Sequence, residues 1–370
     1  MRDVLGIVSF SDPSVDIDGM METRSVGAIS FLGRYRLIDF TLSNFTNSGI
    51  DEIQIYVKNK PRSLVSHVNE GNYNINSKRG GLKFLFNSSY KRNSIYNNDI
   101  SCYMENLQSI EESDKEYVIL APSHLVYRFD FNDLLTAHKQ NGNDITALYV
   151  QTTKAKEQFF MQKSLDIDKE GRVSKFDINL GKYKNAAISL DVMVMRKSLF
   201  IDLVNRAANT SSLYTFDDII KEQLDELKVY TYKYKGVVAS ITSLKEYFDA
   251  NMYLSDLQTS KKIFNSNWQI HTKTNDSCPT KYTKDANVVG SIVANGCIIE
   301  GTVINSVIGR NVIIKKGTVI KDCVILPSVS VAEGAHLEDC IIDKYAEVKY
   351  VKTLKGSKKH PLYVMRRDRI

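Results

Sequence analysis

Serine, histidine and cysteine carry much of the catalytic and metal-binding chemistry of proteins, but their spacing in this sequence supports little of it. The six histidines show no metal-ligand spacing. Ser123 precedes His124, yet adjacent residues of a strand point in opposite directions, so we expect no nucleophile–base pair there. The five cysteines include no C-x-x-C pair, which argues against a disulfide framework or a zinc site and favours a reducing compartment.

Phosphate chemistry would need a glycine-rich loop or clustered cations. Neither G-x-x-x-x-G-K-[ST] nor G-x-G-x-x-G occurs in the sequence. Lysine and arginine total 49 against 43 aspartates and glutamates, an excess too small over 370 residues to indicate nucleic-acid binding. Cations crowd the last twenty residues, at Lys352, Lys355, Lys358, Lys359, Arg366, Arg367 and Arg369. This cluster is typical of a solvated tail, and a phosphate site is the alternative interpretation.

Residues 1–255 alternate short β-branched runs with segments of helical spacing. Ile53–Val57 and Tyr117–Ala121 are typical of strands, and 36–47 carries apolar residues at helical spacing before Gly49. Strand and helix in alternation predict an α/β domain with a mainly parallel sheet. Sites in such sheets lie at the carboxyl ends of the strands.

A different pattern begins at about residue 286. Apolar residues fall six apart at Ile313, Val319, Ile325, Val331 and Leu337, with glycines between them. This period predicts the coils of a parallel β-helix over 286–349, with those residues pointing into its interior. Residues 256–285 read as a polar connector, and 350–370 as a basic C-terminal tail.

Composition bounds the class of protein. The chain is 43% hydrophobic and 25% charged, which is ordinary for globular proteins. No apolar run approaches the ~18–20 residues of a membrane-spanning helix, and the apolar run at the N-terminus reads as a strand rather than a signal peptide. We therefore expect a soluble, cytoplasmic protein of two or three domains with no membrane partner.

One segment resembles a known family closely. GRYRLIDFTLSNFTNSGI at 33–50 matches the G-[KR]-Y-R-I-I-D-F-x-L-S-N-x-x-N-S-G-I of glucose-1-phosphate adenylyltransferases (ADP-glucose pyrophosphorylases). Residues 117–150, 215–224, 233–254 and 291–300 resemble further segments of that family, so the resemblance covers nearly the whole chain. It implies a Rossmann-like nucleotidyltransferase domain followed by a left-handed parallel β-helix of hexapeptide repeats. The implied reaction converts ATP and glucose 1-phosphate to ADP-glucose and pyrophosphate.

The family's functional positions are altered in this sequence. Two aspartates that hold magnesium in the family are replaced by Ser123 and Ser240, and two phosphate-contacting lysines by Val26 and, in a gap-prone stretch, Asn179. A hydroxyl is a poor substitute for a carboxylate toward Mg²⁺. The family's glycine-rich first loop is replaced by a segment that contains Asp12, Asp16 and Asp18. At ~4 Å and an effective dielectric constant of about 20, each like-charge contact with phosphate costs on the order of 4 kcal/mol.

This pattern resembles the non-catalytic D-type (GlgD) subunits of Gram-positive bacteria. The resemblance implies a regulatory, catalytically silent chain that needs no cofactor itself and modulates a catalytic C-type subunit, which binds Mg²⁺, in a heterotetramer. A phosphorylated metabolite could act as effector, and candidate anion ligands are Arg34, Arg36, Arg366, Arg367 and Arg369. Arg34 and Arg36 could equally pair with carboxylates or cap a helix.

Two other functions remain open at this point. The chain could be an active sugar-1-phosphate nucleotidylyltransferase that uses unusual metal ligands such as Asp130, Asp191 or Asp217. Hexapeptide β-helices also occur in acyltransferases that bind coenzyme A, but these need a histidine base, and the repeat contains only His336.

Overall fold

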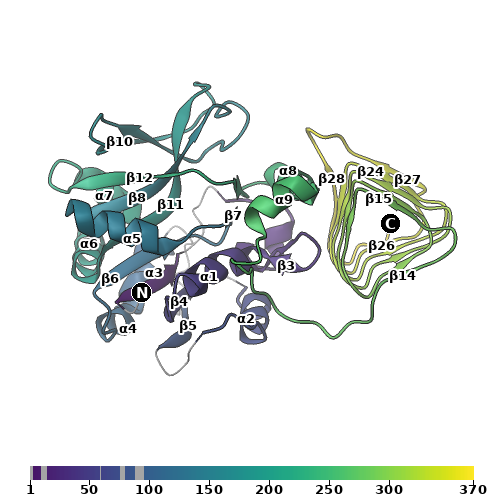
Figure 1. The fold of residues 1–370 in the computed structure, drawn as a ribbon, viewed down its shortest axis with the longest axis horizontal. Coiled ribbons are helices and arrows are strands. Elements are labelled where there is room, and N and C mark those ends of the chain that lie inside the picture. The colour runs from purple at the N-terminus through teal and green to yellow at the C-terminus, as the bar shows by residue number, and fades with distance from the viewer. Residues whose placement is uncertain (1–2, 10–14, 59, 76–79, 88–95) are drawn as a thin grey trace. The chain divides into compact units, whose positions relative to one another are not determined.

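The computed structural model describes residues 3–9, 15–58, 60–75, 80–87 and 96–370, and these residues form two compact units (Figure 1). The N-terminal unit comprises Met1–Ser14, Phe40–Val65 and Tyr73–Val238. The C-terminal unit comprises Val15–Asp39, Ser66–Asn72 and Ala239–Ile370. The domain ranges expected from the sequence are continuous, whereas each unit is assembled from separate segments of the chain.

A mixed β-sheet forms the centre of the N-terminal unit. Its described strands are β1 (Val4–Val8), β4 (Glu52–Val57), β5 (Gly81–Phe86), β6 (Tyr117–Ala121), β8 (Ile145–Thr152), β9 (Lys163–Ile167), β10 (Val173–Ile178), β11 (Ala186–Arg196) and β12 (Val229–Tyr234). They lie in the order β10-β9-β11-β6-β1-β4-β5, with β8 beside β11 and β12 beside β8. The strands β6, β1, β4 and β5 are parallel, as are β8 and β12, whereas β11 runs antiparallel to its neighbours. A mainly parallel α/β sheet is thus confirmed.

Amphipathic helices accompany this sheet. They are α3 (Asp99–Glu105), α4 (Leu107–Glu111), α5 (Phe131–Asn141), α6 (Lys197–Thr210) and α7 (Phe216–Glu222). In α6 the buried residues Phe200, Leu203, Val204 and Ala207 recur every three or four positions, so one face of the helix joins the core. Two more helices, α1 (Leu37–Asn47) and α2 (Arg62–Asn69), contribute residues to both units, as does β13 (Val238–Ser240).

A parallel β-helix forms most of the C-terminal unit. In the described part of the chain its strands make three parallel sheets, one on each side. These are β14 (Lys281–Tyr282), β17 (Ile298–Ile299), β20 (Ile313–Ile314), β23 (Ser330–Val331) and β26 (Glu347–Val348); β15 (Asn287–Val289), β18 (Thr302–Ile304), β21 (Val319–Lys321), β24 (His336–Glu338) and β27 (Thr353–Lys355); and β16 (Ile292–Val293), β19 (Val307–Ile308), β22 (Val324–Ile325), β25 (Cys340–Ile342) and β28 (Leu362–Val364). The expected β-helix of hexapeptide repeats is confirmed.

The interior of the β-helix differs in detail from the expected register. Ile325, Val331 and Leu337 are buried as expected, but Ile313 and Val319 are only half-buried. Their neighbours Ile314 and Ile320 are fully buried instead. Adjacent residues of a strand face opposite sides, so the inward position lies one residue later in these coils. The inward residues Ile314 and Ile320 are six positions apart, and the step from Ile320 to Ile325 is five. From Ile325 onward the buried residues coincide with the expected six-residue series.

The rest of the C-terminal unit, outside the β-helix, includes residues from near the start of the chain. It contains α8 (Leu244–Ser255), α9 (Leu257–Ile263) and the short strands β2 (Ser30–Phe31) and β3 (Tyr35–Arg36). The Tyr247 hydroxyl of α8 donates to the Ser30 carbonyl at 2.6 Å, and the Leu32 N–H donates to Asn251 Oδ1 at 3.0 Å. Residues 15–39 are therefore attached to α8 by hydrogen bonds.

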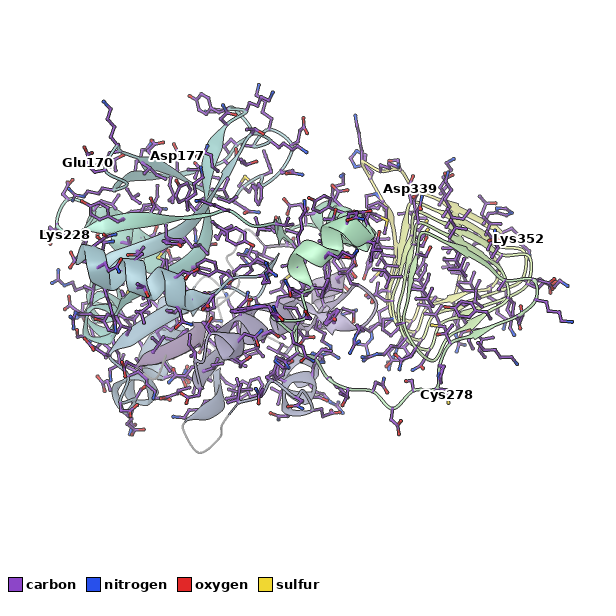
Figure 2. The ribbon with its side chains drawn as sticks, in the orientation of Figure 1. Glu170, Asp177, Lys228, Cys278, Asp339 and Lys352 are labelled. Carbon is purple, nitrogen blue, oxygen red and sulfur yellow. The ribbon has the colours of Figure 1, made fainter. Side chains whose placement is uncertain are left out.

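The basic C-terminal residues take part in the fold. β27 and β28 lie between 350 and 370 and add to the last coil. Lys352 projects from the surface of the β-helix, where its ammonium donates to the Glu333 carbonyl at 2.8 Å (Figure 2). Among the described residues no helix is long and apolar enough to cross a membrane.

Candidate functional site

A cavity of about 530 Å³ lies in the N-terminal unit, at the edge of the sheet where its parallel strands end. Ser9, Lys58 and Pro122 line it, and they follow the carboxyl ends of β1, β4 and β6. The other walls come from the start of α3, from β9 and β11, and from α7. This cavity, which we call the cleft, lies where ligands bind in open α/β sheets.

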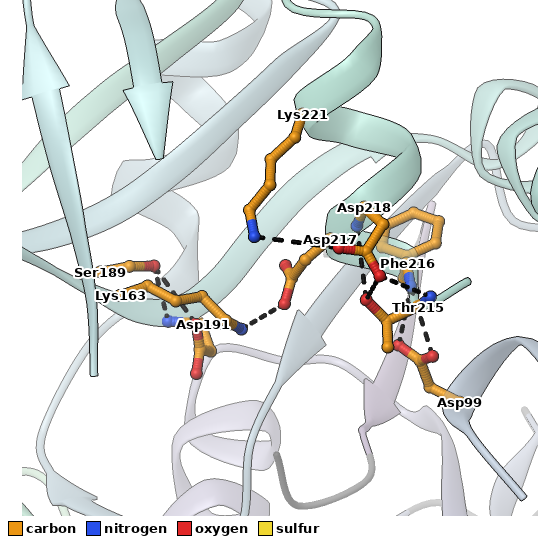
Figure 3. A network of polar contacts seen from close by, with 9 residues as sticks. All are labelled: Asp99, Lys163, Ser189, Asp191, Thr215, Phe216, Asp217, Asp218 and Lys221. Carbon is orange, nitrogen blue, oxygen red and sulfur yellow. Dashed lines mark hydrogen bonds and ion pairs between the residues drawn. The ribbon is translucent and has the colours of Figure 1, made fainter. Parts of the chain in front are cut away.

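Lys163 of β9 stands between two aspartates of the cleft (Figure 3). Its ammonium lies 3.0 Å from Asp191 Oδ1 of β11 and also pairs with Asp217 Oδ2 of α7. These three side chains are only 15%, 22% and 21% exposed, so their ion pairs are screened less than surface pairs. We call them the Lys163 network.

The backbone at Asp191 is unusual for a residue inside a strand. Its φ of 53° lies in the left-handed region, at the irregularity where β11 shifts its register against β8 between Ser189 and Val192. Aspartate tolerates this conformation better than most residues because its short side chain bonds locally. Here the Asp191 N–H donates to Ser189 Oγ at 3.1 Å, which holds the carboxylate toward Lys163.

The start of α7 forms a second polar group in the cleft (Figure 3). Thr215 and Asp218 make a capping box, in which each side chain accepts from the other's backbone N–H. The Asp99 carboxylate accepts N–H groups of Phe216 at 3.1 Å and of Ile100 at 2.8 Å. Burial and the nearby Asp217 raise the pKa of Asp99 to about 6.

The charges of the cleft are nearly balanced. The charged lining residues in the described part of the chain are Lys58, Lys163, Lys221, Asp99, Asp191, Asp217 and Asp218. Lys221 lies 3.9 Å from Asp218, and burial lowers the pKa of Lys58. Carboxylates outnumber ammonium groups by one at neutral pH, so the cleft offers no surplus of positive charge to a phosphate.

A cationic cluster lies in the C-terminal unit. Burial and the charges of Arg36, Arg24 and Arg366 hold the pKa of Lys344 well below its usual value, although the neighbouring Asp343 opposes them. Arg24 is buried and pairs with Asp343 at 2.5 Å, and the Tyr363 hydroxyl donates to the same carboxylate oxygen at 2.7 Å. Arg24 Nη1 and Arg366 Nε are buried donors with no hydrogen-bond partner among the described residues.

Other cations of the C-terminal unit contact aromatic rings or carboxylates. The Arg34 guanidinium stacks over the Tyr35 ring at 5.3 Å, and burial together with Arg34 lowers the pKa of Arg310. Arg367 lies over the Tyr345 ring at 5.9 Å, and Arg366 of the cluster lies over the same ring at 5.6 Å. Arg369 is 72% exposed and pairs with Glu347 at 3.4 Å.

Comparison with known proteins identifies the family. A nucleotidyl transferase model matches residues 21–177, and a model of the GlmU-like, C-terminal hexapeptide matches residues 278–355. The glycogen biosynthesis protein GlgD of Geobacillus stearothermophilus is 32% identical over 323 residues, which cover 86% of this chain and 82% of the relative. This chain belongs to the GlgD and glucose-1-phosphate adenylyltransferase family.

Two further relatives extend the match. GlgD of Bacillus subtilis (strain 168) is 28% identical over 361 residues, which cover 97% of this chain and 94% of the relative. A glucose-1-phosphate adenylyltransferase of Thermosipho africanus (strain TCF52B) is 28% identical over 325 residues, or 87% of this chain and 78% of the relative. The family's GlgD and adenylyltransferase members therefore both align with most of this chain.

The altered family positions are distributed over both units. Ser123 is buried in the turn after β6, and Asn179 is buried after β10, both in the N-terminal unit. The Asn179 amide donates to the Ala155 carbonyl at 2.9 Å and the Phe159 carbonyl at 2.8 Å, so it stabilises a turn. Val26 and Ser240 are buried residues of the C-terminal unit.

Magnesium chemistry does not fit the described residues of the cleft. Asp191 and Asp217 line the cleft and share the single ammonium group of Lys163, and Ser123 is not among the residues that line it. Mg²⁺ is usually bound through one or two protein carboxylates, so a magnesium ion here would have to compete with Lys163 for them. No group of three or more histidine, cysteine or acidic side chains among the described residues could hold a metal ion.

The structure separates the alternative ligands proposed from the sequence. Asp191 and Asp217 meet in the cleft, but Asp130 caps α5 by accepting the Asn132 N–H at 2.9 Å. Asp12 lies outside the described residues, and Asp16 and Asp18 belong to the C-terminal unit.

Sequence reasoning missed several functional candidates. Of the candidate anion ligands, Arg36 and Arg366 are brought to the cationic cluster, whereas Arg24 and Lys344 were not singled out. Lys163 was missed in the same way. No motif in the sequence marked these residues.

Proposed function

We propose that this chain is a regulatory, catalytically silent subunit of a glucose-1-phosphate adenylyltransferase, which converts ATP and glucose 1-phosphate to ADP-glucose and pyrophosphate in glycogen biosynthesis. Its GlgD relatives are named as glycogen biosynthesis proteins. The proposal that the chain is catalytically silent rests on the Lys163 network, in which two carboxylates pair with the ammonium group of Lys163.

The physical argument concerns phosphate charge. Adenylyl transfer is catalysed mainly by cations that hold and neutralise phosphate oxygens. A phosphate in this cleft would meet Asp191 and Asp217, and each like-charge contact at ~4 Å costs on the order of 4 kcal/mol at an effective dielectric constant of about 20. Losing one preorganised charge-stabilising group already slows such reactions by about 10²- to 10³-fold. The paired charges of the cleft therefore support the proposal that the chain is catalytically silent.

The proposed partner is a catalytic C-type subunit in a heterotetramer. Magnesium would belong to that partner, and this chain would need no cofactor. A family member that keeps its fold while its cleft is neutralised can still influence a neighbouring subunit through contacts, which is the role proposed here. Activity of the isolated chain is the direct test.

Purified alone with Mg²⁺, ATP and glucose 1-phosphate, the chain is expected to produce no ADP-glucose above background. Co-purified with a catalytic subunit, it is expected to change that subunit's kcat or KM, with the mass of the complex giving the subunit ratio. Robust magnesium-dependent synthesis by the isolated chain would instead support the alternative of an active nucleotidylyltransferase. No kinetic effect at saturating ratio would contradict a regulatory role.

We place the proposed effector site at the cationic cluster of the C-terminal unit. Arg24, Arg36 and Arg366 supply positive charge around the Lys344 amine, and two buried guanidinium donors lack partners within the described chain. A phosphate monoester offers the acceptors and the negative charge that such a cluster favours. The site would therefore bind a phosphorylated metabolite.

Arg36→Ala and Lys344→Ala are expected to reduce the response of the assembled enzyme to inorganic phosphate or a sugar bisphosphate by tenfold or more in half-maximal concentration. Arg369→Ala is the matched control, because Arg369 is exposed and lies in the basic C-terminal segment outside the cluster. Equal loss in the control, or unchanged sensitivity in both cluster variants, would reject the site.

A further inference from the structure

The cleft keeps its volume although its charges are internally paired. About 530 Å³ falls within the range of small-molecule sites in proteins. Its lining combines the charged network with apolar side chains, including Met161, Met193 and Phe216. A cavity of this size and composition at the carboxyl edge of a parallel sheet can hold a small-molecule ligand.

The arrangement of charges restricts that ligand. An anion near the Lys163 network meets Asp191 and Asp217, and an ammonium group near it meets Lys163 itself. An anion could pair with Lys163 only by displacing a carboxylate, and an ammonium group would compete with Lys163 for the same two carboxylates. A neutral ligand displaces neither ion pair, and its hydroxyl groups can donate to carboxylate oxygens.

Acceptors in the cleft are available for such a ligand. Asp191 uses one oxygen, Oδ1, for its contacts with both Lys163 and Ser189. Asn97 also lines the cleft, and its Oδ1 is buried with no hydrogen-bond partner among the described residues. A buried acceptor without a donor is costly, so a hydroxyl donor placed there would be favoured.

We infer that the cleft is a binding site for an uncharged saccharide, and that Asp191, Lys163 and Asp217 make it select against phosphorylated sugars. A sugar ring presents hydroxyl groups along its edge, which both donate and accept, and apolar C–H groups on its faces. Its hydroxyls match the network and Asn97, and its faces match the apolar lining. Hydrogen bonds to charged groups are stronger than those between neutral groups.

This inference rests on the proposed function, because a cleft that handled ATP and glucose 1-phosphate could not exclude phosphate. The two proposals nevertheless fail in different assays. ADP-glucose synthesis by the isolated chain would contradict the proposed silence. Absence of saccharide binding without synthesis would contradict the present inference alone.

The test is calorimetric titration of the full chain at fixed ionic strength with glucose, maltose, glucose 1-phosphate, adenosine and glucosamine. Glucose or maltose is expected to bind at least ten times more tightly than glucose 1-phosphate. Equal or tighter binding of glucose 1-phosphate, tighter binding of adenosine, or no binding of either neutral sugar would overturn the inference.

Charge variants then locate the binding and its selectivity. The double variant Asp191→Asn with Asp217→Asn leaves Lys163 unneutralised, so affinity for glucose 1-phosphate should rise at least tenfold and the preference should reverse. Lys163→Met leaves the carboxylates without their cation, so glucosamine should gain affinity relative to glucose. The matched control is Asp177→Asn, because Asp177 is exposed and pairs with Lys175 at 3.0 Å outside the cleft (Figure 2).

Two outcomes would overturn the assignment even if a neutral sugar bound. The control could change selectivity as much as the double variant, or both network variants could keep the preference of the original chain while retaining its thermal unfolding profile. Lys163→Met removes the positive charge of the network, and the double variant removes its two negative charges. If one of these variants fails to fold, the other still tests the inference.

Discussion

Asp99 titrates near the physiological range because of its surroundings. Burial, and then the charge of Asp217, raise its pKa to about 6, although N–H groups of Phe216 and Ile100 favour the charged form. An unfolded aspartate has a pKa of about 3.9. Between these values the folded chain binds more protons than the unfolded chain, so this group's contribution to stability is present below about pH 4 and is lost as pH rises through about 6.

Asp99→Asn should remove this titration. Asparagine keeps an acceptor for the two N–H groups without the buried charge, so the free energy of unfolding at pH 7 should rise by at most about 3 kcal/mol. The decline of stability between pH 4 and 6 should become flatter. Urea unfolding across that pH range measures both effects. Asp202→Asn is the control, since Asp202 is half exposed in a surface pair with Arg206; an equal change there would contradict the explanation.

Residues of the N-terminal unit differ in how far a sequence can reveal them. Ser123 could be recognised because it stands inside a motif that the family shares, whereas Asn179 lies in a gap-prone stretch. Lys163 could not, because its partners Asp191 and Asp217 come from a different strand and from a helix. Ion pairs across separate elements leave no spacing pattern in the chain, so their detection needs the structure.

At the level of elements, the six-residue period identified the β-helix but not the inward residue of every coil. Ile314 stacks on Ile299 and Val331 in neighbouring coils, and all three are almost fully buried. Ile313 precedes Ile314 in the same strand and is half-buried on the opposite side. Two consecutive isoleucines have the same hydrophobicity, so only the register of the coil decides between them.

Ile314→Ala should therefore destabilise the β-helix far more than Ile313→Ala. Removing a fully buried isoleucine side chain costs about 2–5 kcal/mol, because it leaves a cavity in the interior. The change at Ile313 should cost less than half as much. Urea unfolding followed by amide hydrogen exchange in the coils measures the difference. Equal losses, or a larger loss at Ile313, would show that the register is wrong.

At the scale of the whole molecule, the C-terminal unit joins segments that are far apart in sequence. The buried ion pair of Arg24 and Asp343 links residues 319 positions apart, with the donor in 15–39 and the acceptor in the β-helix. Composition changes along the chain suggested continuous domains and could not indicate this link. The composition and periodicity of a sequence describe local structure, whereas the unit to which a segment belongs depends on its long-range contacts.

Asp343→Ala should strongly destabilise the C-terminal unit. It leaves the Arg24 guanidinium buried without its carboxylate, which costs about 3–5 kcal/mol in comparable cases. Glu347→Ala is the matched control, because its pair with Arg369 is exposed and such pairs contribute about 0–1 kcal/mol. Thermal and urea unfolding provide the comparison. If the double variant Arg24→Met with Asp343→Leu were as unstable as Asp343→Ala, the unpaired buried charge would not be the cause.

The separation of Arg24 from Asp343 also has a consequence during translation. A ribosome adds about 5–20 residues per second, so Arg24 is incorporated roughly 15–65 s before its carboxylate partner. Throughout that interval the apolar side chains Ile17, Met20 and Phe31, which end up buried, have no β-helix to fold with. Nascent chains halted before residue 343 should consequently be good clients for chaperones and easily cleaved by proteases within 15–39.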